Sequence, residues 1–527
     1  MAHTNVTKLS KGQGFPMLLK AARPDSIARE ACNKYFGEDK VTQITNCLHR
    51  SALNYEAIVE DLMKYERKHV RRMTGDACAI YEMVLQSVRQ DLKKEDKIIP
   101  LTFDEVGKLP DFPGAKSPGL PHKLMNFRTK REVFEDEEQM AILKDMWYAV
   151  ENKKVVHFPD VCLFARAQIA KVPKQKIRAT WGYPFFVYME EARFFYPLQD
   201  YIKSQKHNFP IAYGFEMANG GMSAINDMLL ETKSSQYIVS DWQSFDKTIP
   251  PWLIRDAFAI LAELIDFSSV GRESHNRRRW KAMVDYFVET PIRTCKGERF
   301  LVTGGVPSGS CFTNIIDSII NVIVTRFLVY QTTGKFPTGE IFLGDDGVFT
   351  LDGFANLEDW ASLALQYFGM VLNVSKSYVT SRLDNVHFLG YFNINGQPFK
   401  NQDFLIASFI FPEHRRETKV DACAAALGQM YSGFDPLYAV RWLKIIRFIA
   451  DSEGGHSNED ILLKLRHQAY RHKYLQQVGI DTATMTIPHD SGFVMEVLPK
   501  MSCVHRLRVR NYDPDELAAL ADLRLRS

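Results

Sequence analysis

The chain has few cysteines, and none of them forms a pair with the spacing of a metal-binding motif. The eight cysteines are widely and irregularly placed, and no CxxC sequence occurs. A zinc site or a disulfide framework is therefore not expected. We expect free thiols in a protein that works in a reducing compartment.

Long apolar runs are also lacking. The N-terminal residues MAHTNVTKLSKGQG contain no apolar core of a signal peptide. The most apolar stretch, residues 315–330, is interrupted by Asp317, Asn321 and Arg326, and we expect it to be too short and too polar to span a bilayer. The sequence thus predicts a soluble, intracellular protein with no membrane partner.

An excess of charge of one sign is absent as well. The 66 basic and 63 acidic residues leave a net charge of only +3, so overall basicity gives no argument for a nucleic-acid partner. A phosphate-binding surface would have to gather its positive charge locally. The hydrophobic fraction of 46% is that of a globular protein, and 527 residues predict two or three subdomains.

The patterns that are present change along the chain. Residues 1–100 have helical patterns, and a Pro/Gly-rich connector follows at 109–122. From about 155 to 400, short apolar runs alternate with helical stretches, which is typical of an α+β fold. Helical patterns return in the last part of the chain. The sequence therefore predicts helical flanks around a mixed central region.

The segment IFLGDDGVFTL, residues 341–351, combines two strand-like runs with adjacent acids. It predicts a β-hairpin whose tight turn carries Asp345 and Asp346. The neighbouring glycines permit such a turn but do not require the acids. An ordinary Asp-Gly hairpin has the same pattern, so this segment alone does not define a site.

A second strand also ends in carboxylates. The segment QYIVSDWQSFDKTIP, residues 236–250, predicts a strand that leads into Asp241, with Asp246 five residues later. An acid that caps a strand exit is a common alternative. A strand-end acid and a hairpin acid pair in one sheet can converge, and Mg²⁺ prefers such hard oxygen ligands.

This convergence favours two-metal nucleotidyl transfer, with two Mg²⁺ ions ~3.5–4 Å apart, for which Mn²⁺ can substitute. We expect Asp241 and Asp345 to be the primary ligands and Asp346 to be secondary. A third segment, residues 303–321, is a Gly-rich loop that runs into a helix and offers N–H donors to phosphate. By itself it would indicate only a loop before a core helix.

Three segments in chain order carry a family resemblance. DWQSFD (241–246), SGSCFTNIIDS (308–318) and GDD (344–346) resemble motifs A, B and C of the palm of viral RNA-dependent RNA polymerases. The motifs A to C require metal-binding acids at the strand end and the hairpin turn. The expected carboxylates are therefore found where the resemblance places them.

The resemblance extends to three further segments. KVPKQKIRATWGYP (171–184) resembles the basic fingers motif F, FGMVLNVSKS (368–377) resembles motif D, and VHFLGYF (386–392) resembles motif E, the primer grip. The sequence GGVPSGS together with Asp317, where many positive-strand polymerases have Asn, is similar to polymerases of bisegmented double-stranded RNA viruses, the partitivirus and picobirnavirus group.

The resemblance implies a right-hand fold in which palm, fingers and thumb surround an antiparallel palm sheet. The implied divisions are residues 1–100 as an extension bridging fingers and thumb, 101–235 as fingers with motif F, 236–265 as palm with motif A, 266–302 as a fingers insertion, 303–395 as palm with motifs B to E, and 396–527 as thumb and C-terminal region.

The resemblance also implies roles for individual residues. The catalytic set is Asp241, Asp345 and Asp346, with Lys376 as the acid that protonates pyrophosphate. The nucleotide-binding set is Lys174, Lys176, Arg178, Asp246, Ser308, Gly309, Thr313 and Asp317. The RNA-binding set is Arg166, Lys171, Phe388, Leu389 and Tyr391. For the lysines and arginines a solvated surface stays open as an alternative, and for the last three residues core packing does.

The function implied is genome replication and transcription of a double-stranded RNA virus. The implied partners are an RNA template, the product strand, NTPs and a viral capsid protein, in the virion interior and the host cytoplasm. Two alternatives stay open. A reverse transcriptase shares the palm chemistry but lacks the SG-x₃-T-x₃-D helix, and an RNA-binding structural protein would show no metal-dependent nucleotide incorporation.

Overall fold

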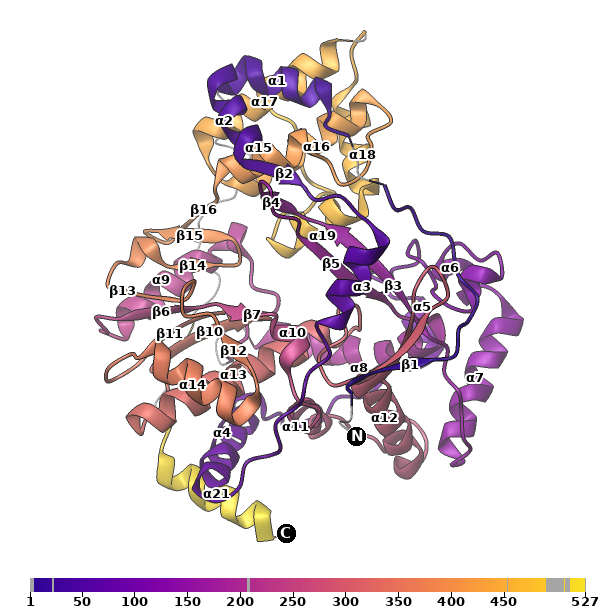
Figure 1. The fold of residues 1–527 in the computed structure, drawn as a ribbon, viewed down its shortest axis with the longest axis vertical. Helices are drawn as coiled ribbons and strands as arrows, with labels where there is room; N and C mark the ends of the chain where they lie inside the picture. The colour runs from indigo at the N-terminus through magenta and orange to yellow at the C-terminus, as the bar shows by residue number, and fades with distance from the viewer. Residues whose placement is uncertain are drawn as a thin grey trace.

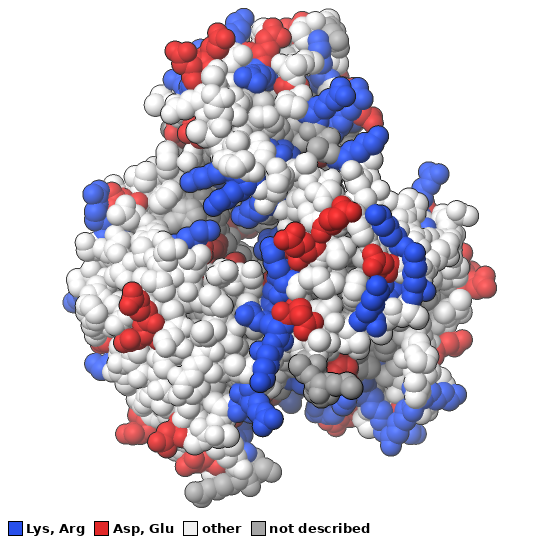
Figure 2. Space-filling model, in the orientation of Figure 1, with Lys and Arg blue, Asp and Glu red and all other residues white. Residues whose placement is uncertain are grey.

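The protein is built from three units. The computed structural model describes residues 4–20, 23–205, 209–452, 454–489, 507 and 512–526. A unit with a four-stranded sheet lies at the left of Figure 1, a unit with a five-stranded sheet at the right, and a helical unit at the top. In the space-filling view of Figure 2, a hollow lies at the centre of the face, where the three units meet.

The four-stranded antiparallel sheet, which we call the carboxylate sheet, has the order β10-β11-β6-β13. Its strands are β10 (Gly339–Leu343), β11 (Asp346–Thr350), β6 (Tyr237–Ser240) and β13 (Tyr378–Thr380). Leu343 pairs with Asp346 across the hairpin, and Gly347 pairs with Ser240. The hairpin and the strand expected from the sequence are both present, and their register places the acidic turn beside the end of β6.

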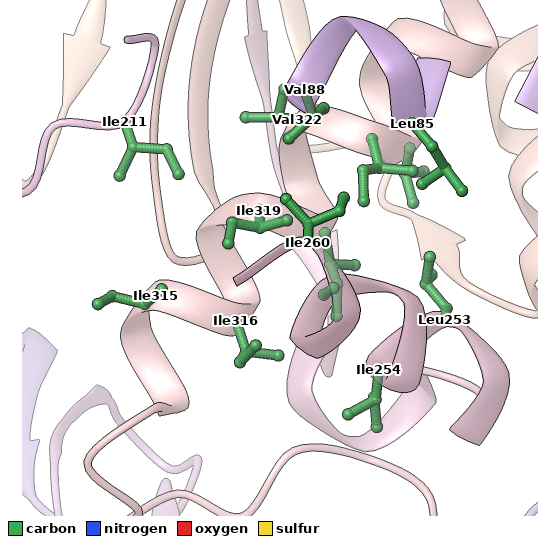
Figure 3. Packing of buried hydrophobic residues seen from close by; sticks show 14 of the residues in the cluster. Leu85, Val88, Ile211, Leu253, Ile254, Ile260, Ile315, Ile316, Ile319 and Val322 are labelled. Atoms are coloured by element: carbon green, nitrogen blue, oxygen red, sulfur yellow. The ribbon is translucent and has the colours of Figure 1, made fainter. Parts of the chain in front are cut away.

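Helix α13 (Thr313–Thr333) lies in the main core behind this sheet. Helices α4 (Asp76–Leu92) and α11 (Pro251–Ala262) pack against it. Figure 3 shows isoleucine and valine side chains of α13 among apolar side chains of α4 and α11. Burial of this apolar surface supplies most of the favourable free energy that holds the helix in place.

The same helix corrects one expectation. It spans 21 residues, and its most apolar window has a mean hydropathy of 1.3, so by length and composition it could cross a membrane. The expectation that this stretch is too short and too polar is therefore wrong. In the folded chain, however, 83% of that window is buried inside the protein, as is usual for a core helix.

A buried arginine ties α13 to distant parts of the chain. Arg326 is 0% exposed and donates to Glu340 of β10 at 2.8 Å and to Asp91 of α4 at 2.6 Å. Tyr512 donates to the same Asp91 carboxylate at 2.5 Å. It precedes helix α21 (Pro514–Arg526), which packs along α4.

The five-stranded sheet includes a strand from the N-terminal part of the chain. Its order is β1-β9-β8-β3-β5, with β1 (Val6–Leu9), β9 (Arg299–Thr303), β8 (Glu289–Arg293), β3 (Val161–Ala167) and β5 (Ile177–Gly182). Helices α7 (Glu137–Glu151), α8 (Phe185–Ser204) and α12 (Glu273–Val288) pack beside it. Strand β1 pairs antiparallel with β9, so the edge of this sheet is formed by residues that are far from its other strands in sequence.

The helical unit contains α15 (Gln402–Ile410), α16 (Lys419–Gly433), α17 (Pro436–Asp451), α18 (Asn458–His467) and α19 (Ala469–Gln477). Small residues from Ala422 to Ala426 on α16 let α17 approach closely. The N-terminal helices α1 (Ser26–Phe36) and α2 (Glu38–Cys47) pack against this unit. Residues before 50 therefore contact both the helical unit and the five-stranded sheet.

The remaining α-helices and strands complete the three units. They are β2 (Leu48–Arg50), α3 (Tyr55–Met63), α5 (Phe103–Gly107), α6 (Lys130–Phe134), β4 (Ile169–Lys171), α9 (Gly221–Glu231), β7 (Trp242–Gln243), α10 (Phe245–Thr248), α14 (Leu357–Phe368), β12 (Val371–Leu372), β14 (His387–Phe388), β15 (Tyr391–Ile394) and β16 (Gln397–Phe399). Strand β2 pairs with β4, and β7 pairs with β12.

Candidate active site

The backbone of Asp241 is held by the segment that follows β12. The Asp241 N–H donates to Ser377 Oγ at 2.8 Å, and the Ser377 hydroxyl donates back to the Asp241 carbonyl at 3.2 Å. The N–H of Asn373 donates to the same carbonyl at 2.8 Å. These contacts fix the position from which the Asp241 carboxylate extends. Ser377 is therefore a local anchor for this acid.

Three carboxylates influence one another at the edge of the carboxylate sheet. Surrounding protein atoms raise the pKa of Asp345, although its side chain is solvent-accessible, and the charges of Asp246 and Asp241 raise it further. Burial and the charge of Asp345 raise the pKa of Asp346 to about 7. Burial raises the pKa of Asp241, and Lys376 opposes this rise. The structure thus brings the three acids and Lys376 together.

These acids suit a divalent cation in chemical type. Their donor atoms are carboxylate oxygens, which are hard ligands of the kind that Mg²⁺ and Mn²⁺ take. A cation between the acids would also reverse the mutual repulsion that raises their pKa values. In the parts of the chain that the structure describes, no three His, Cys, Asp or Glu side chains stand in an arrangement that could already hold a metal ion.

Asp317 and Asp246 share a hydrogen bond beside this cluster. Asp317 is only 4% exposed, and burial together with the charge of Asp246 raises the pKa of Asp317 well above its ordinary value. Two carboxyl groups can share a hydrogen bond only if one of them keeps a proton, so we assign the proton to Asp317. Its Oδ1 has no hydrogen-bond partner within the described residues.

The loop before α13 is shaped by close backbone contacts. A Cβ on Gly309 would lie 1.8 Å from the Trp181 carbonyl oxygen, so no larger residue fits. The Trp181 N–H donates to the Ser308 carbonyl at 2.9 Å, and Thr313 Oγ1 donates to the Pro307 carbonyl at 2.5 Å. The structure thus gives Gly309 and Thr313 roles in holding the loop, and the Ser308 side chain is half-buried.

Glu191 of α8 lies beneath the same loop. It is 1% exposed and accepts hydrogen bonds from the Ser310 hydroxyl and the Cys311 N–H. Burial raises the pKa of Glu191 to about 8, although both donors oppose the rise. Sequence reasoning missed this residue because Glu191 lies within a helical pattern outside the recognised motifs.

Glu191→Gln is expected to reduce the pH dependence of stability. In the wild type the folded state keeps a proton that the unfolded chain has lost, so this contribution is complete below pH 4.5 and is lost as the pH rises through about 8. The loss is at most about 1.4 kcal/mol per pH unit. Gln keeps one oxygen that can accept from the Cys311 N–H, places an NH₂ group that can donate to the Ser310 hydroxyl, and cannot ionise. Thermal unfolding across this range measures the effect, and equal slopes for both proteins would contradict it.

The basic segment around β5 borders the acids. Lys171, Lys174, Lys176 and Arg178 are all exposed. The charge of Lys176 lowers the pKa of Asp241, and that of Arg178 lowers the pKa of Asp345 and Asp317. In Figure 2, Lys and Arg side chains gather around the central hollow and in a band below it. Positive charge is therefore concentrated locally, as a nearly neutral chain would require.

Arg166 has a different environment. It forms an ion pair with Glu413 at 2.7 Å, and its guanidinium lies 4.1 Å from the Tyr470 ring centroid. Both partners belong to the part of the chain after residue 400. In the described conformation Arg166 joins the five-stranded sheet to the helical unit. Because its guanidinium is engaged in these contacts, fewer of its N–H groups are available to bind RNA than the sequence suggested.

The expected primer-grip residues need a correction. Phe388 is 1% exposed and Tyr391 is 0% exposed, so their side chains are packed in the core and face no RNA. The Tyr391 hydroxyl donates to the Ser432 carbonyl at 2.8 Å. Leu389, between them, has a positive φ of 51°, and its N–H bonds to the Asp346 carboxylate. The core-packing alternative holds for Phe388 and Tyr391.

Sequence reasoning missed two further groups of residues. Tyr65 is 2% exposed, donates to the Val306 carbonyl at 2.8 Å, and lies near enough to Asp246 and Asp317 for their charges to raise its pKa. Ser318 and Asn321 contact the turn between β10 and β11. Both residues are polar positions within the largely apolar α13, and this alone gave no indication of what they contact.

An antiparallel sheet with converging acids, enclosed by a mixed unit and a helical unit, defines the right-hand polymerase class. The carboxylate sheet corresponds to its palm, the five-stranded unit to its fingers and the helical unit to its thumb. A family model for the viral RNA-dependent RNA polymerases matches residues 37–397, which is more than half of the chain. The chain belongs to this family, and the resemblance drawn from the motifs is confirmed.

Named relatives agree with this assignment. The RNA-directed RNA polymerase of Atkinsonella hypoxylon virus is 28% identical over 351 residues, which cover 56% of this chain and 50% of that protein. The corresponding protein of Cryptosporidium parvum virus 1 is 27% identical over 279 residues, covering 51% and 50%. The chain thus spans about half the length of the curated relatives it matches.

Solved structures share the fold. The Sicinivirus 3Dpol RNA-dependent RNA polymerase superposes with a TM-score of 0.65 at 15% identity, covering 90% of this chain and 99% of that one. The RNA-dependent RNA polymerase of a human picobirnavirus gives a TM-score of 0.61 at 14% identity, covering 92% and 93%. The palm, fingers and thumb architecture expected from the sequence is therefore confirmed.

Proposed function

We propose that this chain copies RNA templates by joining NTPs, as the polymerase of a double-stranded RNA virus. The observation that carries the proposal is the meeting of Asp241, Asp345 and Asp346 at one edge of the palm sheet, beside the basic strand β5. Carboxylates that raise one another's pKa, next to exposed lysine and arginine side chains, form a site for metal ions and a triphosphate.

The chain's own residues divide the work of this reaction. We propose that Asp241 and Asp345, with Asp346, hold two divalent cations, which when bound would activate the attacking 3′-hydroxyl and stabilise the leaving pyrophosphate. Lys174, Lys176 and Arg178 neutralise the triphosphate. Lys376, whose charge acts on Asp241, delivers a proton to the pyrophosphate.

The partners follow from this activity. They are an RNA template, the product strand, NTPs and a viral capsid protein, in the virion interior and the host cytoplasm. The contact of Lys171 with RNA is also part of the proposal, because this lysine is exposed at the end of β4. Nothing in these assignments depends on the side chains of Phe388 and Tyr391.

The subdomain boundaries are proposed as the sequence suggested them. Strand β1 pairs with β9 of the fingers sheet while α1 and α2 pack on the thumb, which supports a bridging role for residues 1–100. Strands β8 and β9 complete the sheet of β3 and β5, which supports a fingers insertion at 266–302. We assign residues 101–235 to the fingers, residues 236–265 and 303–395 to the palm, and residues 396–527 to the thumb and C-terminal region.

The direct test is nucleotide incorporation. Purified protein, a defined RNA template and labelled NTPs are incubated with Mg²⁺, with Mn²⁺, or with a chelator. The proposal expects template-length RNA that requires both the template and the divalent cation. Incorporation of dNTPs on the same template, with none from NTPs, would point to a reverse transcriptase instead. Binding of RNA without any synthesis would point to a structural RNA-binding protein.

Asp246 and Asp317 are expected to select ribonucleotides. RNA is distinguished from DNA by its 2′-hydroxyl, which both donates and accepts hydrogen bonds. Asp317 offers a buried Oδ1 without a partner within the described residues, and Asp246 lies beside it. Loss of this match should cost ~1–3 kcal/mol. Asp246→Ala and Asp317→Ala should therefore lose NTP efficiency and lower the ratio of NTP to dNTP incorporation.

Asp317→Asn supplies the matched control for this prediction. Because Asp317 keeps its proton, an uncharged amide of the same shape should preserve most of the activity and the discrimination. Steady-state incorporation of NTPs and dNTPs by the three variants measures both. If the alanine variants slow the two substrates equally, these acids support the fold or the metal site and do not read the sugar.

A further inference from the structure

The turn that carries Asp345 is bound on its backbone by α13. The Gly344 N–H donates to Ser318 Oγ at 2.8 Å. The Asn321 amide donates to the Gly344 carbonyl at 3.0 Å and to the Asp346 carbonyl at 3.3 Å. The contacts therefore involve backbone groups on both sides of Asp345, and they leave its carboxylate unused.

Both contacting side chains are enclosed. Ser318 and Asn321 are each 0% exposed. Thr325, one turn further along α13, donates to Asn321 Oδ1 at 3.3 Å and thereby orients the amide so that its NH₂ group faces the turn. Ser318 Oγ donates to the Asn314 carbonyl at 2.6 Å, which turns its lone pairs toward Gly344. The hydrogen-bonding capacity of the pair is thus directed at the turn.

The turn needs such support. Gly344 has a φ of 59°, in the left-handed region, and Asp345 and Asp346 repel each other. The pairing between β10 and β11 ends at Leu343 and Asp346, so no hydrogen bond between the strands holds the two turn residues, Gly344 and Asp345. Without further contacts, the position of Asp345 would depend on a short turn that carries two like charges.

We propose that Ser318 and Asn321 are positioning residues of the active site, which hold the Asp345–Asp346 turn at the place where divalent cations bind. The inference rests on the proposed function. It gives α13 a second role, because the end near Thr313 faces the nucleotide and the next turns hold the metal-binding hairpin. Outer contacts of this kind typically alter metal affinity or activity by about 10- to 100-fold.

The test compares Asn321→Ala with Asn276→Ala. Asn276, in α12 of the fingers, is 2% exposed and also donates from its amide to two backbone carbonyls, those of Phe267 and Val270. The chemical change, the burial and the number of donated hydrogen bonds are therefore matched, and Asn321→Ala loses in addition only the bond that Thr325 donates. Asn276 contacts none of the acids of the palm, so its variant reports the cost of such a deletion alone.

Two readouts separate positioning from stability. Binding of Mn²⁺ to the free protein, followed by electron paramagnetic resonance, should weaken about 10-fold in Asn321→Ala and stay unchanged in Asn276→Ala. The kcat for nucleotide incorporation should fall about 100-fold in Asn321→Ala alone, because displacement of a catalytic group by about 1 Å has this effect. The KM for NTPs and the affinity for RNA should change little.

Ser318→Ala provides a second variant if Asn321→Ala does not fold. It removes one contact with the turn, the acceptor for the Gly344 N–H, together with the bond to the Asn314 carbonyl within α13. It should therefore weaken Mn²⁺ binding in the same direction by a smaller factor. Wild-type Mn²⁺ affinity in either folded variant would overturn the inference. Absence of any synthesis by the wild type would overturn the proposed function instead, and the Mn²⁺ titration would still decide the role of the pair.

Discussion

Asp345→Ala is expected to reduce nucleotide incorporation by about 10³-fold or more. Removal of an acid that we propose to be shared by two cations should cost several kcal/mol in the transition state, and ~4 kcal/mol corresponds to this factor. The fold should survive, because Asp345 is exposed at the tip of a turn and its side chain supports no packing. Single-turnover incorporation on a primed RNA template measures the loss.

The control for this variant is Asp352→Ala. Asp352 follows β11 at the other end of the hairpin, where its side chain is 64% exposed and forms an ion pair with Lys335 at 3.6 Å. Removal of that carboxylate changes the net charge by the same amount and should leave synthesis unchanged. Circular dichroism and thermal unfolding confirm that both variants are folded. Normal synthesis by Asp345→Ala would disprove the proposed metal site.

Arg326→Met is expected to destabilise the protein by about 3–5 kcal/mol, because removal of one partner leaves buried carboxylates without their counter-charge. Arg326 is fully buried between Asp91 and Glu340 and donates to both. Methionine preserves most of the side-chain volume, so the change tests charge rather than packing. Denaturant-induced unfolding measures the loss.

Two comparisons sharpen this prediction. Arg255→Met removes an ion pair with Asp285 whose side chains are 43% and 39% exposed, and it should have a much smaller effect. Combining Arg326→Met with Asp91→Asn and Glu340→Gln removes the two negative charges that face Arg326 and should recover part of the lost stability. If the triple variant is no more stable than Arg326→Met, the loss comes from packing and not from buried charge.

The acids of the palm could be found from the sequence because their pattern is local. The strand that leads into Asp241 and the hairpin that carries Asp345 can each be predicted from neighbouring residues. The order of the motifs then indicated that these acids lie close together. The two isolated polar residues of α13, Ser318 and Asn321, had no such local pattern. Their partner is the backbone of a turn more than twenty residues away, and nothing in a single sequence shows that contact.

Burial explains the errors. The segment around Phe388 was expected to touch RNA because it resembles motif E, the primer grip, but alternation along β14 and β15 turns Phe388 and Tyr391 into the core. The stretch of α13 was expected to be too short and too polar to span a bilayer, and this was wrong because only the folded protein shows where the helix begins and ends. The pairing of β1 with β9 joins residues almost three hundred positions apart, and periodicity along the chain carries no information about it.

The link between Tyr512, Asp91 and Arg326 has a consequence for how the protein is made. The ribosome synthesises every catalytic motif, from 171 to 392, more than one hundred residues before it adds Tyr512. Until then the carboxylate of Asp91 lacks this hydroxyl, and α4 lacks the helix α21 that covers it. A chain released early, by a premature stop codon or a nick, would contain a complete set of motifs on an unfinished palm. The packing around α4 is therefore completed only by a part of the chain that is synthesised after all of the motifs.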